Sequence, residues 1–330
     1  MPHTLSLEGR IGKATRSQLS VRIDFGGFVH RKRLIIRGSS ALRLVLLMAA
    51  ATAAGAQSAK EMPAHESPPY LGFDRNDYPG DAALPSLRKT FHYTGYWLNN
   101  PPGETVNSWT GKRAILRENG FGFLVLFTGR TDAEIRSAKE RAGELGLQDG
   151  KAAVVAAVRE GFASNVLIFL DQEEGGRLLP EQAAYLFAWA DAVRSGGARP
   201  GVYCSGIEVP DGSGSISTAR DLVEKESTYA SAGKTAEQRI SLWIADDQCP
   251  PAPGCTTAAP RLESGVSVNL RRSVVVWQYA LSPRRPQFSA SCPQNQAHDG
   301  NCYAPGLAAN ARVFVDLDTA NSPDPSESSD

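Results

Sequence analysis

The stretch Asn165-Val-Leu-Ile-Phe-Leu-Asp-Gln-Glu-Glu-Gly175 joins an apolar run directly to three carboxylates. A continuous apolar run bounded by turn residues is typical of a strand that is buried in a parallel sheet. Side chains alternate along a strand, so Asp171 and Glu173 are expected on one face, with Cα atoms about 6–7 Å apart. Two carboxylates at the end of a buried strand can share the acid and charge-stabilising roles of glycosidic bond cleavage. A solvated acidic turn is the alternative interpretation.

Seven further runs have strand character, and four helical patterns lie among them. The expected strands are Tyr70–Asp74, Thr90–Leu98, Gly122–Thr128, Val166–Asp171, Gly201–Cys204, Ser241–Ala245, Val274–Tyr279 and Arg312–Asp316. The expected helices are Thr131–Leu147, Gly150–Gly161, Pro180–Arg194 and Ser217–Ala232. Strands that alternate with helices predict a parallel sheet, and eight of them predict an α/β protein with a single closed (β/α)₈ barrel. A doubly wound open sheet is the alternative.

Polar residues stand at or just beyond the C-terminal ends of these strands. They are Asp74, Asn99, Arg130, Asp171, Glu173, Ser205, Asp246, Gln278 and Asp316. In a barrel of parallel strands these ends converge on one face, where active sites are built. We therefore expect Asp74, Asp171, Glu173 and Asp316 to share one cleft.

The N-terminal residues 1–56 are expected to be an extension with an export signal. Basic residues from Arg31 to Arg43 precede the apolar stretch Leu44–Ala54, and Ala54-Gly-Ala56 has the small-x-small pattern of a cleavage site. The apolar stretch is too short to span a bilayer, so no stable membrane insertion is expected. A polar, Pro-rich linker over residues 57–69, the barrel over 70–318 and a disordered polar tail over 319–330 complete the expected organisation.

Charge and cysteine content limit the partners. The formal net charge is +0, but residues 57–330 alone carry a balance of −7. That balance argues against a nucleic-acid-binding surface. An exported chain permits disulfides, and local pairs Cys249–Cys255 and Cys292–Cys302 are expected, although four cysteines allow three pairings. Cys204 ends an apolar run and is expected to be a buried free thiol.

Six short motifs occur in an order that resembles a known family. They are Gly72-Phe-Asp74, Leu170-Asp-Gln-Glu173, Gly201-Val-Tyr203, Leu242-Trp-Ile-Ala245, Trp277-Gln-Tyr279 and Val315-Asp-Leu-Asp318. Together they resemble the glycoside hydrolase family 25 lysozymes. With Tyr78-Pro79, Gly95-Tyr96-Trp97 and Gly120-Phe-Gly-Phe123, the sequence is more similar still to the bacterial glycoside-hydrolase-like domain of unknown function.

The resemblance implies a (β/α)₈ barrel that cleaves peptidoglycan at N-acetylhexosamine linkages. It implies that Glu173 is the general acid, with a pKa raised by burial and neighbouring carboxylates, and that Asp171 assists. Asp74 and Asp316 would hold this pair in position. The residues expected to contact sugar are Trp97, Tyr203, Asp246, Gln278 and Tyr279. Asp318 departs from the pattern, because the lysozymes usually carry Asn there.

The implied protein is a secreted monomer, periplasmic or extracellular, that acts on a cell-wall glycan without a cofactor or metal. The alternative from another class is a non-catalytic protein that binds cell-envelope polysaccharide on the same barrel. A metal-dependent deacetylase is disfavoured because residues 57–330 contain only His65, His92 and His298, without a paired-His motif. A serine hydrolase is disfavoured because Gly-x-Ser-x-Gly is absent.

Overall fold

The computed structural model separates the chain into two units, Met1–Glu66 and Ser67–Asp330. It describes residues 7–8, 18–21, 33–35, 69–231, 239–247, 258–281 and 313–327. In the first unit, strands β1 (Leu7–Glu8), β2 (Gln18–Val21) and β3 (Arg33–Ile35) form an antiparallel sheet in that order. The expected apolar signal stretch, the cleavage site, nearly all of the linker and four of the five cysteines lie outside the described residues.

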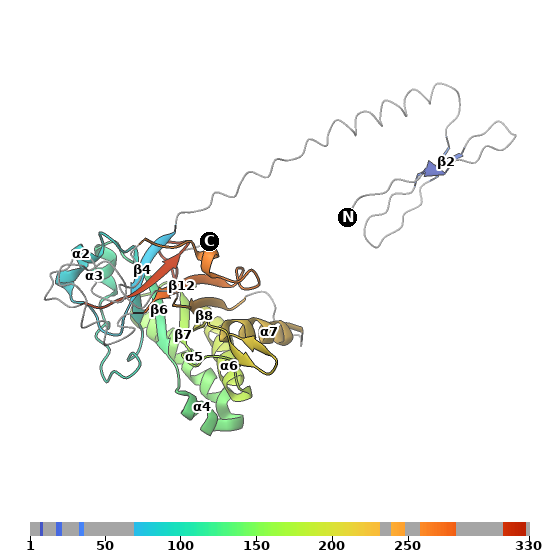
Figure 1. The fold of residues 1–330 in the computed structure, drawn as a ribbon. Coiled ribbons are helices and arrows are strands. Elements are labelled where there is room, and N and C mark those ends of the chain that lie inside the picture. The colour runs from blue at the N-terminus through green and yellow to red at the C-terminus, as the bar shows by residue number, and fades with distance from the viewer. Residues whose placement is uncertain are drawn as a thin grey trace. The chain divides into compact units, whose positions relative to one another are not determined.

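The second unit is a closed eight-stranded barrel (Figure 1). Its strands are β4 (Tyr70–Asp74), β5 (Tyr93–Trp97), β6 (Gly122–Thr128), β7 (Leu167–Asp171), β8 (Arg199–Ser205), β11 (Ser241–Ala245), β12 (Val274–Ala280) and β13 (Asp316–Ala320). They follow one another around the barrel in chain order, and β13 closes it against β4. The prediction of a barrel is confirmed, and the open sheet is excluded.

One strand of the barrel differs from the expected all-parallel arrangement. β13 is antiparallel to both of its neighbours, β12 and β4, whereas the other pairs are parallel. The expected last strand, Arg312–Asp316, is therefore wrong in position and direction: the strand begins at Asp316. β13 starts at the end of the barrel at which β12 finishes, so the chain needs no crossover to the opposite end.

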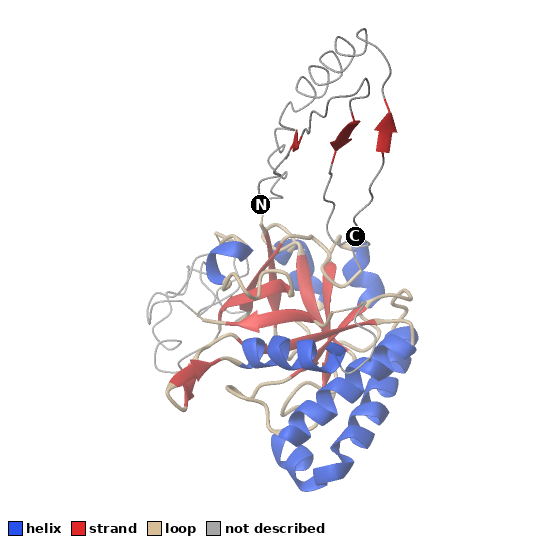
Figure 2. Ribbon diagram, turned by 90° about the vertical axis from the view of Figure 1, so that its right-hand side faces the viewer, coloured by secondary structure: helices blue, strands red, loops and turns tan. Residues whose placement is uncertain are grey.

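Helices cover the outside of the barrel (Figure 2). They include η1 (Asp81–Ala83), α2 (Leu84–Leu87), α3 (Arg113–Glu118), α4 (Asp132–Ala138), η2 (Lys139–Arg141), α5 (Ala142–Arg159), α6 (Pro180–Ser195), α7 (Thr218–Ser231) and α8 (Leu262–Gly265). A short antiparallel hairpin of β9 (Val209–Asp211) and β10 (Gly214–Ile216) precedes α7. The helices α5 and α6 lie against each other closely because Gly146 and Gly150 face α6. An added Cβ at Gly146 would stand 2.0 Å from the carbonyl oxygen of Tyr185.

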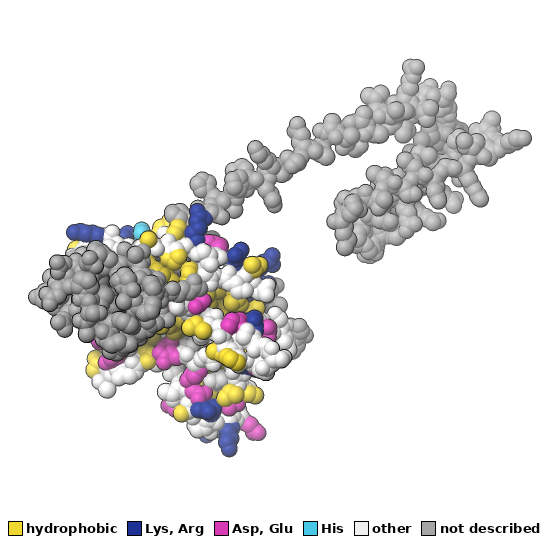
Figure 3. Space-filling view, in the orientation of Figure 1, with side chains coloured by type: hydrophobic (Ala, Val, Ile, Leu, Met, Phe, Trp, Pro, Cys, Tyr) yellow, Lys and Arg dark blue, Asp and Glu magenta, His cyan; other side chains and the backbone are white. Residues whose placement is uncertain are grey.

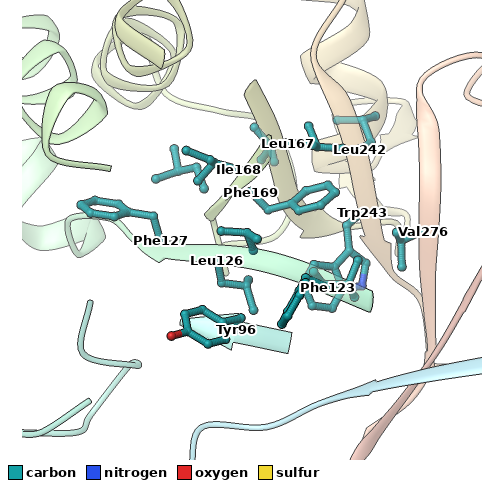
Figure 4. Packing of buried hydrophobic residues seen from close by; sticks show 14 of the residues in the cluster. Tyr96, Phe123, Leu126, Phe127, Leu167, Ile168, Phe169, Leu242, Trp243 and Val276 are labelled. Atoms are coloured by element: carbon teal, nitrogen blue, oxygen red, sulfur yellow. The ribbon is translucent and has the colours of Figure 1, made fainter. Parts of the chain in front are cut away.

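Large apolar side chains fill the barrel. Leu126, Phe169, Trp243 and Val276 come from four different strands and are nearly or fully buried, and Figure 4 shows them gathered in the interior. Phe169 and Trp243 pack edge to face, with ring centroids 5.6 Å apart. This layer closes the barrel beneath the polar end, so any site must lie above it.

Residues beyond β13 are ordered against the N-terminal end of the barrel. Ser326 is fully buried; its hydroxyl accepts a hydrogen bond from the Val125 amide, and its carbonyl accepts one from the Leu167 amide. Glu327 forms ion pairs with Arg113 and Arg117. The expected disordered tail over 319–330 is therefore wrong for residues 319–327. Its polar side chains satisfy strand amides and arginines, which composition alone does not reveal.

Candidate functional site

Three predicted carboxylates meet at the C-terminal end of the parallel strands. Asp74 and Asp171 are the last residues of β4 and β7. Asp316 is the first residue of β13 and pairs with Asp74 across the antiparallel ladder. Asp316 thus reaches the expected end of the barrel, although the strand bounds from which it was placed there are wrong.

A hydrogen-bonded chain crosses the barrel just below this end. The Tyr203 hydroxyl donates to Gln278 Oε1 at 2.7 Å, and Gln278 Nε2 donates to Asp74 Oδ1 at 2.7 Å. Gln278 is 1% exposed, so neither bond is replaced by water at low cost. Burial is the largest cause that raises the pKa of Asp74, to about 6, and the bond from Gln278 opposes it.

A fourth carboxylate, Asp318, lies one layer deeper and was not among the predicted site residues. Its Oδ1 accepts a hydrogen bond from Trp243 Nε1 at 3.0 Å, and its carboxyl lies beside that of Asp74. Asp318 is fully buried, and burial followed by the nearby Asp74 raises its pKa well above the usual range. The alternation in Val315-Asp-Leu-Asp318 places Asp316 and Asp318 on one strand face and is the signal that could have identified it.

The pair Asp171 and Glu173 consists of one half-buried and one exposed carboxylate. Burial, followed by the neighbouring Glu173 and Asp74 carboxylates, raises the pKa of Asp171 well above its usual range. Glu173 itself is exposed. The expected burial of Glu173 is not observed, because β7 ends at Asp171 and Gln172 takes the next buried position.

The loop that carries Glu173 is fastened to the neighbouring helix. The Thr218 hydroxyl donates to the carbonyls of Glu174 and Gly176 at 3.1 and 2.9 Å. The fully buried Asp221 accepts from the Leu178 amide at 2.9 Å and from Arg177 Nη1 at 2.8 Å. Two residues of α7 therefore fix both the start and the end of the segment that follows Glu173.

The five residues expected to contact sugar are in three different situations. Tyr203 and Gln278 belong to the hydrogen-bonded chain beside the carboxylates. Trp97 is 4% exposed and Tyr279 is 3% exposed, so both are mainly packing residues; Trp97 Nε1 donates to the Arg75 carbonyl at 3.1 Å. Asp246 is half-buried at the end of β11, where its amide donates to the Gln278 carbonyl.

No group of three or more His, Cys, Asp or Glu residues suited to a metal ion occurs within the described parts of the chain. Among those same residues, no helix is both long enough and apolar enough to cross a membrane. Cys204 is a buried free cysteine, as predicted, and burial raises the pKa of its thiol to about 12. The predicted disulfides lie outside the described residues. Acidic and basic side chains are interspersed on the described surface that Figure 3 shows.

Residues 107–249 match the family model described as Rv2525c-like, glycoside hydrolase-like domain. The resemblance to a glycoside-hydrolase-like domain is thereby confirmed over this segment, which contains Asp171, Glu173, Tyr203 and Asp246. A search of curated proteins gave no match.

Three solved structures have partial similarity to this chain. An uncharacterised B. stearothermophilus protein is 20% identical, with a TM-score of 0.46, over 76% of this chain and 95% of its own. The Tat-secreted protein Rv2525c of Mycobacterium tuberculosis is 12% identical, with a TM-score of 0.41, over 77% of this chain and 96% of its own. The catalytic domain of the endolysin ply40 from the Listeria monocytogenes bacteriophage P40 is 13% identical, with a TM-score of 0.39, over 78% of this chain and 94% of its own.

Proposed function

We propose, from the glycoside-hydrolase-like segment 107–249 and the carboxylates at its barrel end, that this protein hydrolyses a cell-wall glycan. The observation that carries the proposal is the half-buried Asp171 carboxyl, whose pKa is raised by desolvation, beside the exposed Glu173. Two carboxylates in unlike environments can hold different protonation states at one pH, as acid-catalysed glycoside cleavage requires. Asp74, Gln278 and Tyr203 form the support beneath them.

In the first assignment, Glu173 protonates the glycosidic oxygen and Asp171 stabilises the cationic sugar or orients its acetamido group. This follows the family resemblance. The exposure of Glu173 lets it reach a large polymeric substrate, and a bound glycan would itself remove water from around the carboxylate. The substrate would be peptidoglycan, cleaved at an N-acetylhexosamine linkage.

The partial desolvation of Asp171 favours a second assignment, in which Asp171 holds the proton and Glu173 acts as the ionised partner. Burial in a low-dielectric environment favours the neutral carboxyl, and the adjacent carboxylates add to the effect. A protonated carboxyl at neutral pH is what a general acid needs. Each assignment uses the same two residues with exchanged roles.

The test is release of reducing ends from purified peptidoglycan by wild type, Glu173→Gln and Asp171→Asn, with Glu181→Gln as the matched control. Glu181 is a half-buried carboxylate in the first turn of α6. Loss of the general acid should lower the rate about 10²–10⁴-fold, and the control should keep it. The variant with the larger loss, and with the acidic limb of the pH–rate profile altered, identifies the proton donor.

Absence of reducing-end release by folded wild type, across several wall glycans and pH values, would reject the hydrolase proposal. The same polymers then test the other candidate, a non-catalytic polysaccharide-binding protein. That candidate is favoured by the exposure of Glu173, which lacks the burial that commonly keeps a general acid protonated. Co-sedimentation with insoluble wall glycan measures it directly.

Export belongs to this proposal as well, since the substrate lies outside the cytoplasm. The pattern that supports it is the basic segment before Leu44–Ala54 and the site Ala54-Gly-Ala56. Expression in a bacterial host followed by N-terminal sequencing of the exported fraction should give a chain that begins at Gln57. A chain that stays in the cytoplasm with its N-terminus intact would contradict export.

A further inference from the structure

We propose that Asp318 is a positioning residue that keeps its proton and donates it in a hydrogen bond to Asp74, so that the two buried carboxyls carry one negative charge. This rests on the proposed function in so far as Asp74 supports the catalytic pair. The arrangement of donors and acceptors around the two groups carries the inference.

The hydrogen bonds of Asp318 leave one oxygen for a proton. Oδ1 accepts from Trp243 Nε1 at 3.0 Å. Oδ2 is buried and meets no donor group among the residues that the structure describes. A buried carboxylate oxygen without a donor is costly, but the same oxygen as an O–H group becomes a donor itself.

Asp74 is the acceptor that this donor needs. Its carboxyl lies beside that of Asp318, and its Oδ1 accepts a hydrogen bond from Gln278 Nε2 at 2.7 Å. The register explains why the two carboxyls approach: Asp318 lies opposite Gly72 on β4, two residues before Asp74 on the same face. Gly72 has no side chain, and the Tyr93 ring occupies the space, only 1.8 Å from where a Cβ would stand.

Within the described part of the chain, the groups around the pair add no positive charge beside it. The ionisable side chains that act on Asp318 or Asp74 come from β5, β7, β8, β12 and β13: they are Tyr93, Asp171, Tyr203, Tyr279 and Asp316. Arg75 interacts with Asp316 rather than with the pair. Two ionised carboxylates within this mostly acidic and neutral set would repel each other, and one shared proton removes that repulsion.

A protonated Asp318 makes the same hydrogen bonds as an asparagine. Asparagine at this position could accept from Trp243 through Oδ1 and donate to Asp74 through Nδ2, at every pH. Leucine has a similar volume and can do neither. Asp318→Asn is therefore the conservative variant that should preserve the site, and Asp318→Leu is the variant that should disrupt it.

The test compares urea unfolding of wild type and Asp318→Asn between pH 5 and 8. A folded-state carboxyl with a raised pKa keeps its proton while the unfolded chain loses it, so wild-type stability falls as pH rises above the unfolded value. Asparagine has no such dependence. As pH rises, the unfolding equilibrium constant of wild type should therefore increase relative to that of Asp318→Asn by up to about tenfold per pH unit.

The control is Asp77→Asn, which removes an exposed carboxylate and should leave the pH dependence as in wild type. If the unfolding free energies of wild type and Asp318→Asn depend on pH in the same way, the proposal is overturned. If Asp318→Asn does not fold, a protein that retains Asp318 decides the question. An infrared spectrum of the Asp171→Asn protein with ¹³C-labelled aspartate should show a protonated-carboxyl band at pH 7, and absence of that band would overturn the proposal.

The stability and infrared measurements do not use activity, so they stand if the protein proves not to be a hydrolase. If it is one, Asp318→Asn should keep kcat/KM within about threefold of wild type, and Asp318→Leu should lose at least tenfold. The loss should be accompanied by a displaced pH–rate profile, which a purely structural defect would not produce. Equal losses in both variants would overturn the positioning role.

Discussion

Asp316 and Asp74 are register partners in the ladder between β13 and β4, although 242 positions separate them in the chain. The antiparallel direction of β13 makes this pairing possible. A parallel strand that began at Asp316 would place it at the opposite end of the barrel from Asp74. With β13 reversed, Asp316 lies at the barrel rim and Asp318 lies one layer below it, against the interior residues Trp243 and Asp74.

The bridge made by Gln278 provides the first prediction. Gln278→Ala removes the donor to Asp74 and the acceptor for Tyr203, both in the buried interior. The unfolding free energy should fall by about 1–3 kcal/mol for each buried group left without a partner. Because the Gln278 bond lowers the pKa of Asp74, its removal should move that pKa above about 6. Denaturant unfolding and a ¹³C NMR titration of the aspartate carboxyls measure the two effects.

Tyr203→Phe is the matched control for the bridge. It removes one hydroxyl donor and leaves the Gln278–Asp74 bond intact. We expect a loss of about 0.5–1.5 kcal/mol in the unfolding free energy. The pKa of Asp74 should not change, because its hydrogen bond from Gln278 remains. A larger pKa shift in Tyr203→Phe than in Gln278→Ala would show that Gln278 is not the link.

The fastening of the Glu173 loop to α7 provides the second prediction. Asp221→Ala removes the acceptor of the buried Leu178 amide, which should lower the unfolding free energy by about 1–3 kcal/mol. The loop should also become more mobile, with faster amide hydrogen exchange between Gln172 and Leu178. If the hydrolase proposal holds, kcat/KM should fall because Glu173 is no longer held in place.

Glu224→Ala is the control on the same helix. Glu224 is exposed, three residues after Asp221, so its removal should change stability by less than about 0.5 kcal/mol and leave hydrogen exchange in the loop unchanged. Equal exchange rates in Asp221→Ala and Glu224→Ala would mean that the loop is ordered by other contacts.

The third prediction concerns the C-terminal residues that close the other end of the barrel. Glu327 is largely buried between Arg113 and Arg117, whose guanidinium groups also lie over the Phe162 and Phe123 rings. Glu327→Ala should lower the unfolding free energy by about 1–3 kcal/mol, less than a fully buried pair because both arginines are partly exposed. Thermal unfolding measures the loss, and Glu118→Ala on α3 is the exposed control. Equal melting temperatures for Glu327→Ala and Glu118→Ala would show that the ion pairs of Glu327 with Arg113 and Arg117 are not stabilising.

The barrel and three of its carboxylates could be predicted because local sequence determines them. Apolar runs such as Gly122–Phe127 and Leu167–Leu170 form buried strands whichever strands lie beside them, and polar residues stand at their ends. The strands Tyr70–Asp74, Gly122–Thr128 and Ser241–Ala245 were predicted with the bounds that the structure has.

The features that sequence reasoning missed depend on contacts between distant segments. The direction of β13 is set by where the chain returns to the barrel, and Val313–Val315 has the same apolar character whether or not it is in a strand. The order of residues 321–327 depends on amides of β6 and β7, so a polar composition could not reveal it. The exposure of Glu173 follows from the end of β7 at Asp171, because the alternation of side chains between two faces does not extend beyond the strand.

The fourth prediction concerns the thiol of Cys204. This cysteine is fully buried in β8, and burial alone raises the pKa of its thiol to about 12. Since the thiolate is the reactive form, only about one molecule in 10⁴ would carry it at pH 8, and the reagent would also have to enter the barrel wall. Iodoacetamide at pH 8 should therefore leave Cys204 unmodified in the folded protein and modify it fully in denaturant, as measured by mass spectrometry of its tryptic peptide. The denatured sample controls for the detection of the peptide. Equal modification in both samples would mean that β8 opens readily to solvent. Asp74, which is linked through Gln278 to the preceding residue Tyr203, would then not be held rigidly.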